Sequence, residues 1–266
     1  MGGLVLTPVV RNLLIINAAI FIAAAILGKE ILFAEWFGLR AFTSTFFSPL
    51  QLVTYMFMHG GWQHLIFNMM GLIFLGPLLE TFWGSKRFFI FYMATGIGAG
   101  AIDSAIHSFE VRNVIIDSQT YMADPTPENY VWFLGRNYPE GLHNEAELIE
   151  NFEQNPTSEA YVRGTQNMTK MIENSLSNRM SIGASGAIFA LMMALAFLFP
   201  NTELMMLFLP IPIKAKYFVA FSAAMALYMA LRRDPSDNVA HFAHLGGMLS
   251  AWILLMFWQR QRNSFY

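Results

Sequence analysis

A serine in a turn of small residues and a histidine in a second apolar segment are the most informative pair in this chain. Ser185 lies in the motif GASG (183–186), and His244 lies in the motif AHLGG (243–247). A serine hydroxyl is a weak nucleophile and needs an adjacent base, for which imidazole is the commonest side chain. A histidine inside an apolar segment is costly to bury, so it is a functional hypothesis by default. The pair predicts nucleophilic catalysis, with Ser185 as nucleophile and His244 as general base.

Stripes of small residues give these two segments a way to meet. Residues four apart share one face of a helix, and small side chains on that face let two helices approach closely. One segment carries such a pair and the other carries a longer stripe: Gly186 and Ala190 in the first, and Ala243, Gly247 and Ala251 in the second. We expect these faces to pack together, although the same pattern also occurs in helix pairs without catalytic function. His241, one turn before His244, is an alternative base, and we favour His244.

A third polar group lies in the motif HGGWQHLIFN (59–68). His64 and Asn68 are four residues apart, so both can point hydrogen-bond donors at one site. Such donors can stabilise an oxyanion, as can the free amides at the start of the helix that carries Ser185. Gly183 would let the substrate approach closely there. The alternative is a structural hydrogen bond between helices, worth about 1 kcal/mol. His59 precedes its helix, and we expect it to have a structural role.

The segments that must position these residues are apolar and helical. Hydrophobic residues make up 55% of the chain and charged residues 13%, and spanning a bilayer takes about 20 apolar residues. We therefore expect an all-α, polytopic membrane protein with six transmembrane helices, the fourth and fifth being short. Pro210 and Pro212 make residues 204–212 a connector instead of a helix. The six apolar runs are 12–28, 62–81, 88–107, 183–199, 216–231 and 240–258.

Residues 108–178, the 108–178 segment, differ from the rest of the chain. They hold 11 of the 18 acidic residues and four basic ones. We interpret them as a polar extracytoplasmic insertion between the third and fourth helices, either a partly ordered loop or an element that gates substrate entry. Asn144 and Ser158 are candidate caps for two helices, near 145–154 and up to about 178. The chain then divides into helices 1–3 (1–107), the insertion (108–178) and helices 4–6 (179–266).

The distribution of basic residues predicts the orientation in the membrane. Short cytoplasmic loops carry an excess of Lys and Arg, and seven against four favours cytoplasmic termini. We expect a multi-pass protein of the bacterial cytoplasmic (inner) membrane. The seven are Arg11, Lys86, Arg87, Lys214, Lys216, Arg260 and Arg262, and the four are Lys29, Arg40, Arg232 and Arg233.

Composition excludes several other functions. The absence of cysteine excludes thiol catalysis and zinc–thiolate sites, and a net charge of −2 does not support binding to nucleic acid. A zinc site built from histidines is an alternative, but no His-Glu-x-x-His sequence occurs. A channel or transporter would also place polar groups inside a helical bundle, but no inverted repeat is visible. We expect no metal and no cofactor.

The ordered set of motifs resembles that of the rhomboid intramembrane serine proteases. The resemblance covers residues of about 50–107 and 180–258, and places the motifs on the second, fourth and sixth helices of a six-helix bundle. It implies a Ser185–His244 dyad without an acid, and an oxyanion hole formed by His64, Asn68 and the Ser185 amide. Phe189 stands where members of the family often carry an aromatic residue that stacks on the histidine.

Two features depart from the family pattern. Leu50-Gln51 replaces the Trp-Arg pair that bacterial members carry in their first loop, and this puts the anchoring of the loop in question. The 108–178 segment is far longer than the usual connection. Neither Asp103 nor Glu80, the two acids in the apolar runs, is placed to complete a triad.

The resemblance implies an endopeptidase that cleaves transmembrane segments of membrane proteins through an acyl-enzyme, with the lipid bilayer as its surroundings. Water must reach the dyad, so we expect a polar cavity lined by His59, His64, Asn68, Ser185, His241 and His244. The alternative is a non-catalytic member that binds and escorts membrane helices.

Overall fold

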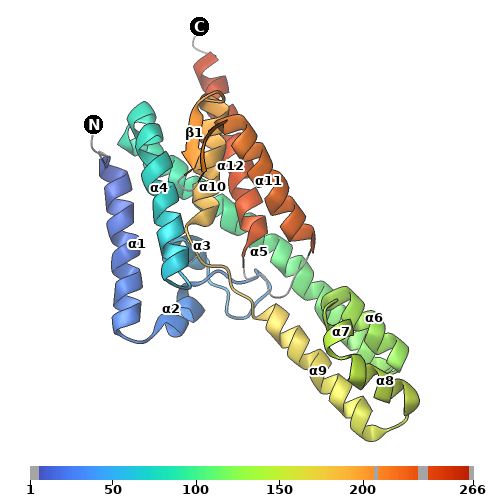
Figure 1. The fold of residues 1–266 in the computed structure, drawn as a ribbon. Coiled ribbons are helices and arrows are strands. Elements are labelled where there is room, and N and C mark those ends of the chain that lie inside the picture. Colours follow the sequence, from blue (N-terminus) through green and yellow to red (C-terminus); the bar gives the residue numbers. More distant parts are fainter. Residues whose placement is uncertain (1–5, 207–208, 233–238, 264–266) are drawn as a thin grey trace.

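The computed structural model describes residues 6–206, 209–232 and 239–263 (Figure 1). Each of the six apolar runs forms a helix, and the bounds are close to the predicted ones except at the end of the third helix. Arg233, which entered the charge balance, lies outside the described residues. The six helices are α1 (Pro8–Ile26), α4 (Trp62–Trp83), α5 (Ser85–Ala123), α10 (Ser185–Leu198), α11 (Ala215–Arg232) and α12 (His241–Asn263).

Four of the described helices are long and apolar enough to cross a membrane: α1, α4, α5 and α12. The helix α10 is apolar but has only 14 residues. These findings indicate a multi-pass membrane protein. The expectation of six spans depends on α10 and α11 and stays a prediction.

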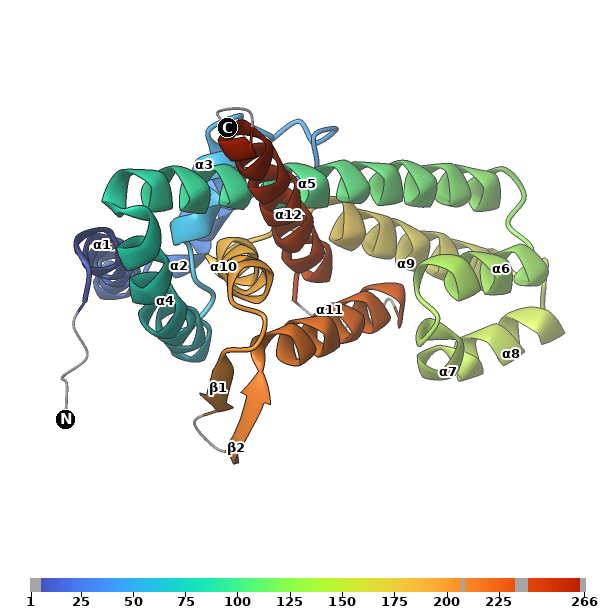
Figure 2. The same ribbon diagram turned by 90° about the horizontal axis from the view of Figure 1, so that it is seen from above.

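The short helix α10 lies at the centre of the bundle, with α4, α5, α11 and α12 around it (Figure 2). Its buried side chains are small or aliphatic, such as Ala187, Ala190 and Leu191, which are fully buried. A helix that is apolar on all sides is satisfied only by contact with other helices or with lipid. The central position therefore explains how a helix too short to span a bilayer unaided is accommodated.

Glu80 joins the ends of three helices on one side of the bundle. Its carboxylate accepts hydrogen bonds from the amides of Val9 and Val10 at the start of α1, both at 3.0 Å. It also accepts bonds from the hydroxyls of Thr7, at 2.5 Å, and of Ser85, at 2.6 Å. The first amides of a helix have no partner within the helix. The buried Glu80 carboxylate gives the α1 amides acceptors, and the amides give the carboxylate donors.

The predicted end of the third helix, at residue 107, is wrong. The helix α5 continues without interruption to Ala123, giving 39 residues. Val111, Val114 and Tyr121 in the continuation are buried, because helices of the 108–178 segment pack against them. The prediction ended the helix where the apolar run ends, and the sequence of that run does not reveal the packing that extends it. The domain boundary expected at 107/108 falls inside the helix, and the division into domains stays a prediction.

The 108–178 segment folds into helices that pack together beside the bundle (Figure 1). After the continuation of α5 come α6 (Pro127–Asn137), α7 (Gly141–Asn144), α8 (Ala146–Gln154) and α9 (Glu159–Ser177). They share a hydrophobic core of their own, which includes Val114, Tyr121, Tyr130, Phe133, Leu134 and Phe152. The segment is thus a packed unit, not an extended loop.

One of the two predicted helix caps in this segment is wrong. Ser158 does occupy the N-cap position of α9, although its side chain makes no capping hydrogen bond. Asn144 ends α7 instead of capping α8, and its amide bonds the Tyr138 hydroxyl at 3.0 Å.

Two connections complete the fold. Between α1 and α4 the chain forms α2 (Glu30–Phe37), α3 (Gln51–Thr54) and a 3₁₀ turn, η1 (Tyr55–Phe57). Between α10 and α11 it forms an antiparallel hairpin of β1 (Glu203–Met206) and β2 (Leu209–Lys214). The prolines were expected to prevent a helix, and none forms. The strand pairing was not predicted, because Pro210 and Pro212 can occupy a strand only where no ladder bond is needed from them.

Candidate active site

Ser185 is the first residue of α10, and the turn before it places its backbone amide at an open helix end. Gly183 has a φ of 119°, a conformation that favours glycine. Its amide donates to the carbonyl of Tyr55 at 2.8 Å, which fixes the turn to η1. The amides of the first helical turn have no partner within the helix, so they can receive an anion.

The small-residue stripes bring α10 and α12 into backbone contact, and this contact positions the serine–histidine pair. Gly247 lies so close to α10 that a Cβ built on it would overlap the carbonyl of Gly186. At this approach the Nε2 atom of His244 lies 2.9 Å from the Oγ atom of Ser185. The distance is that of a hydrogen bond between a nucleophile and its base.

Phe189 fixes the plane of the histidine ring. The rings of Phe189 and His244 are stacked with centroids 4.0 Å apart and an interplanar angle of 6°. Because Phe189 is one turn after Ser185 on the same helix, α10 contributes both the hydroxyl and the surface on which the imidazole rests. Stacking of this kind limits rotation of the imidazole, a task that a buried carboxylate performs in a triad.

The donors on α4 lie on the other side of Gly183. A Cβ built on Gly183 would lie 2.6 Å from Nε2 of His64 and 3.7 Å from Nδ2 of Asn68. The Nδ1 atom of His64 accepts from the amide of Gly60 at 3.4 Å, so we infer that Nε2 carries the proton and faces the turn. Asn68 uses one amide hydrogen on the carbonyl of His64, at 3.0 Å, and keeps the second.

The two remaining histidines flank this group. The His59 ring is buried in the loop before α4 and lies edge-on to His64, with centroids 5.1 Å apart. Burial lowers the pKa of His59 to about 4, and the neighbouring His64 adds to this shift. On α12, the ring of His241 is perpendicular to that of His244 at 5.9 Å. The imidazole within hydrogen-bond distance of the Ser185 hydroxyl is that of His244.

With this geometry in place, comparison with known proteins decides the family. The model of the Rhomboid domain matches residues 47–114 and 162–261, more than half of the chain. The chain belongs to the rhomboid family. All three motifs lie within the matched ranges, and residues 115–161, inside the 108–178 segment, lie outside them.

Similarity to a curated relative is weaker and covers only part of each chain. Rhomboid-like protein 16, chloroplastic, from Arabidopsis thaliana is 31% identical over 104 residues. The match covers 39% of this rhomboid and 32% of that protein, so the chain aligns with about a third of the length of this relative.

Gln51 anchors the first loop of this rhomboid, whose anchoring was in question because Leu50-Gln51 replaces the Trp-Arg pair of bacterial members. Its side-chain amide donates to the carbonyl of Phe46 at 3.0 Å and to that of Trp36 at 3.3 Å. Its amide oxygen accepts from the backbone of Ser48 at 3.3 Å, and the residue is buried. The loop therefore has an anchor, which the sequence did not indicate because glutamine carries no motif of its own.

Asp103 and Ser181 form a second polar contact that the sequence did not indicate. The Ser181 hydroxyl donates to the Asp103 carboxylate at 2.5 Å, which ties α5 to the chain four residues before Ser185. Ser181 also pairs with Leu39 through backbone hydrogen bonds in both directions. Asp103 thus supports the segment between α9 and α10 that leads to Ser185. The Asp103 carboxylate bonds Ser181, and the Glu80 carboxylate bonds groups at the starts of α1 and α5, so neither is engaged as the acid of a triad.

One residue expected to line a polar cavity, His241, lines a cavity beside the bundle. A cavity of about 750 Å³ opens beside α12, and its wall includes His241 but none of the other five residues expected to line it. Among the described residues, no group of three or more His, Asp or Glu side chains could hold a metal ion.

Proposed function

We propose that this rhomboid is an intramembrane serine endopeptidase that uses a Ser185–His244 dyad. The observation that carries the proposal is the 2.9 Å contact between Ser185 Oγ and His244 Nε2, with Phe189 stacked on the imidazole. A serine used only for helix packing would have no need of an oriented base. Further support comes from the family, to which intramembrane serine proteases belong.

The reaction follows from the positions of these groups. Ser185 Oγ attacks the carbonyl carbon of a peptide bond while His244 Nε2 takes its proton, so His244 must begin as the tautomer protonated at Nδ1. Collapse of the tetrahedral intermediate breaks the C–N bond, and His244 gives its proton to the leaving amine. A water molecule, deprotonated by the same imidazole, then hydrolyses the acyl-enzyme and regenerates Ser185.

His64, Asn68 and the Ser185 amide would hold the oxyanion of the intermediate. The 2.6 Å between His64 Nε2 and a Cβ built on Gly183 means that a side chain there would fill the space the oxyanion needs. In soluble proteases one such donor is worth about 10²–10³ in kcat.

The substrate class follows from the surroundings of the site. The apolar helices indicate a lipid bilayer around the bundle. A transmembrane segment can reach Ser185 from within the bilayer, and it must unwind because helical peptide bonds are engaged in hydrogen bonds. We further propose six spans with both termini in the cytoplasm of a bacterium. The 108–178 segment then lies on the outer side.

The test is cleavage of a panel of transmembrane model substrates by the purified protein in detergent. The parent chain should cleave at least one, Ser185→Ala and His244→Ala should reduce kcat by about 10⁴ or more, and EDTA should have no effect. A fluorophosphonate probe should label the parent and not Ser185→Ala, because only an activated serine reacts.

Ser222→Ala is the matched control, since Ser222 is also a helical serine and its hydroxyl donates to the carbonyl of Phe218 within its own helix, α11. Retained cleavage in His244→Ala with loss in His241→Ala would move the base one turn. Absence of both cleavage and labelling in the parent chain would contradict the proposal and favour the escort function.

A further inference from the structure

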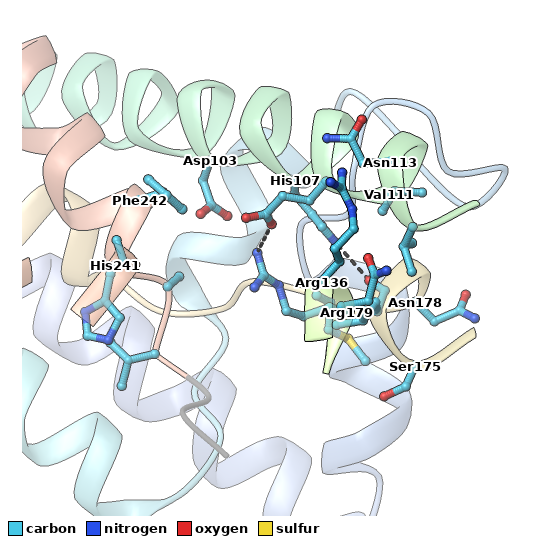
Figure 3. Close-up of a pocket in the computed structure, with 18 of the residues that line it drawn as sticks. Asp103, His107, Val111, Asn113, Arg136, Ser175, Asn178, Arg179, His241 and Phe242 are labelled. Carbon is cyan, nitrogen blue, oxygen red and sulfur yellow. Dashed lines mark hydrogen bonds and ion pairs between the residues drawn. The ribbon is translucent and has the colours of Figure 1, made fainter. Parts of the chain in front are cut away.

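The 750 Å³ cavity lies where the 108–178 segment meets the bundle (Figure 3). One wall is formed by α5 between Asp103 and Asp117, and a second by α6 and the end of α9. The third wall comes from the end of α11 and the start of α12, including His241 and Phe242. The cavity therefore depends on the 108–178 segment, whose central part, residues 115–161, lies outside the family match.

Most of the charges in this cavity neutralise one another. Arg136 pairs with Asp117 at 3.0 Å, and Arg179 pairs with Glu110 at 3.4 Å. The Nε2–H of His107 is committed to the carbonyl of Leu176 at 2.9 Å. Among the described charges that line the cavity, the carboxylate of Asp103 is the one without a cationic partner.

Asp103 is also incompletely hydrogen-bonded. Its residue is 2% exposed, one carboxylate oxygen accepts from Ser181, and the other, Oδ1, has no hydrogen-bond partner. A buried acceptor without a partner is unfavourable, most of all when it is charged. Figure 3 shows the side chain pointing from α5 into the cavity. A cationic donor entering the cavity would relieve both deficits at once.

The position of Asp103 relative to Ser185 suggests where this donor comes from. Asp103 bonds Ser181, which is four residues before Ser185, and an extended chain covers about 14 Å in four residues. The other wall carries His241, one turn from His244. Asp103 is also about 27 Å along α5 from Ser85, close to the thickness of a bilayer core. The cavity thus lies at the membrane surface, within a few residues of the dyad.

We propose that this cavity binds a lysine or arginine side chain of the substrate, placed about three to five residues from the scissile bond where the substrate leaves the membrane. The cation would pair with Asp103 between α5 and α12, which makes Asp103 a specificity-determining residue. This inference rests on the proposed protease function.

The test varies the charge on the substrate first. A model transmembrane peptide that the parent chain cleaves is made with Lys, Gln or Glu at each of the three positions. The parent chain should prefer Lys over Gln by about tenfold in kcat/KM at one of them, as expected for one hydrogen bond to a charged group, and should disfavour Glu. Because this series needs no change in the protein, it does not depend on how a variant folds.

The second arm compares two aspartates of the same cavity. In Asp103→Asn the ratio of Lys to Gln cleavage should fall to about one, whatever the absolute rate. In Asp117→Asn, where the acid already pairs with Arg136, the ratio should persist. Asp103→Glu keeps the charge and should retain part of the preference.

Two results would overturn the inference while leaving the protease function intact. One is equal cleavage of the Lys, Gln and Glu peptides by a parent chain that reacts with the fluorophosphonate probe. The other is a Lys preference that survives in Asp103→Asn. Failure of the parent to cleave any peptide or to react with the probe would instead contradict the protease function itself.

Discussion

Replacing Gly247 with alanine tests whether the closeness of α10 and α12 sets the catalytic geometry. A Cβ at residue 247 would lie 2.8 Å from the carbonyl carbon of Gly186 and would overlap its oxygen, whereas ordinary contacts begin at 3.4 Å. The obstacle is backbone and no side chain can rotate away, so relieving the overlap with the carbonyl oxygen requires the two helices to separate by about 1 Å or more.

The dyad has little tolerance for such a movement. The Ser185–His244 contact is 2.9 Å, and a shift of about 1 Å takes it beyond the usual range of a hydrogen bond. A displacement approaching 1 Å can cost about 10² in rate, so we expect Gly247→Ala to lower kcat by about 10²-fold with a much smaller change in KM.

The assay measures kcat and KM on a cleaved model substrate, together with the rate of fluorophosphonate labelling and the thermal unfolding midpoint. Gly98→Ala, in α5, is the control. Its added Cβ would also meet α12, but there it would meet the side-chain hydroxyl of Ser250, which can rotate away. If Gly247→Ala keeps its kcat within threefold of the parent, or if Gly98→Ala loses as much, helix separation does not control the dyad and the reasoning is refuted.

Two more outcomes follow from the rings around the dyad. Phe189→Leu should lower kcat by about 2–12-fold, because an aromatic stack contributes about 0.5–1.5 kcal/mol, and Phe197→Leu on the same helix should not; equal effects in a cleavage assay would argue against the stack. The pKa of His59 is about 4 in the folded protein against an ordinary 6.5, so the unfolded chain takes up a proton first as the pH falls. Stability should therefore be full above about pH 6.5 and fall by about 3 kcal/mol towards pH 4. In thermal unfolding at pH 7.5 and 4.5, His59→Asn should show less of this loss than the parent, and replacement of the exposed His143 should leave it unchanged.

The sequence predicted the helices of the bundle well, because each of them depends on a continuous apolar run. It also predicted which faces of α10 and α12 meet, since Gly186 and Gly247 belong to stripes whose spacing is visible in one dimension. The convergence of His64 and Asn68 on Gly183 could be anticipated from helical spacing and the family resemblance together. Their catalytic roles stay predictions.

What the sequence could not predict depends on tertiary partners. The helix α5 passes residue 107 because the 108–178 segment covers Val111 and Val114, and nothing local records that cover. Gln51 and Asp103 were missed for a related reason. Glutamine forms no recognisable motif, and an aspartate near a helix end predicts neither the serine that bonds it nor the cavity that it faces.

The uninterrupted course of α5 has a mechanical consequence. Its 39 residues span about 58 Å, nearly twice a bilayer core, and contain no proline. A continuous helix of this length is stiff, so it fixes the orientation of helices α6–α9 about the α5 axis relative to the dyad. Insertion of one residue after Asp103 would rotate helices α6–α9 by about 100° about the α5 axis. Insertion of seven residues would move these helices about 10 Å further along the axis but change their orientation by only about 20°. The fold should therefore tolerate insertions in α5 that add whole helical turns better than insertions that add part of a turn.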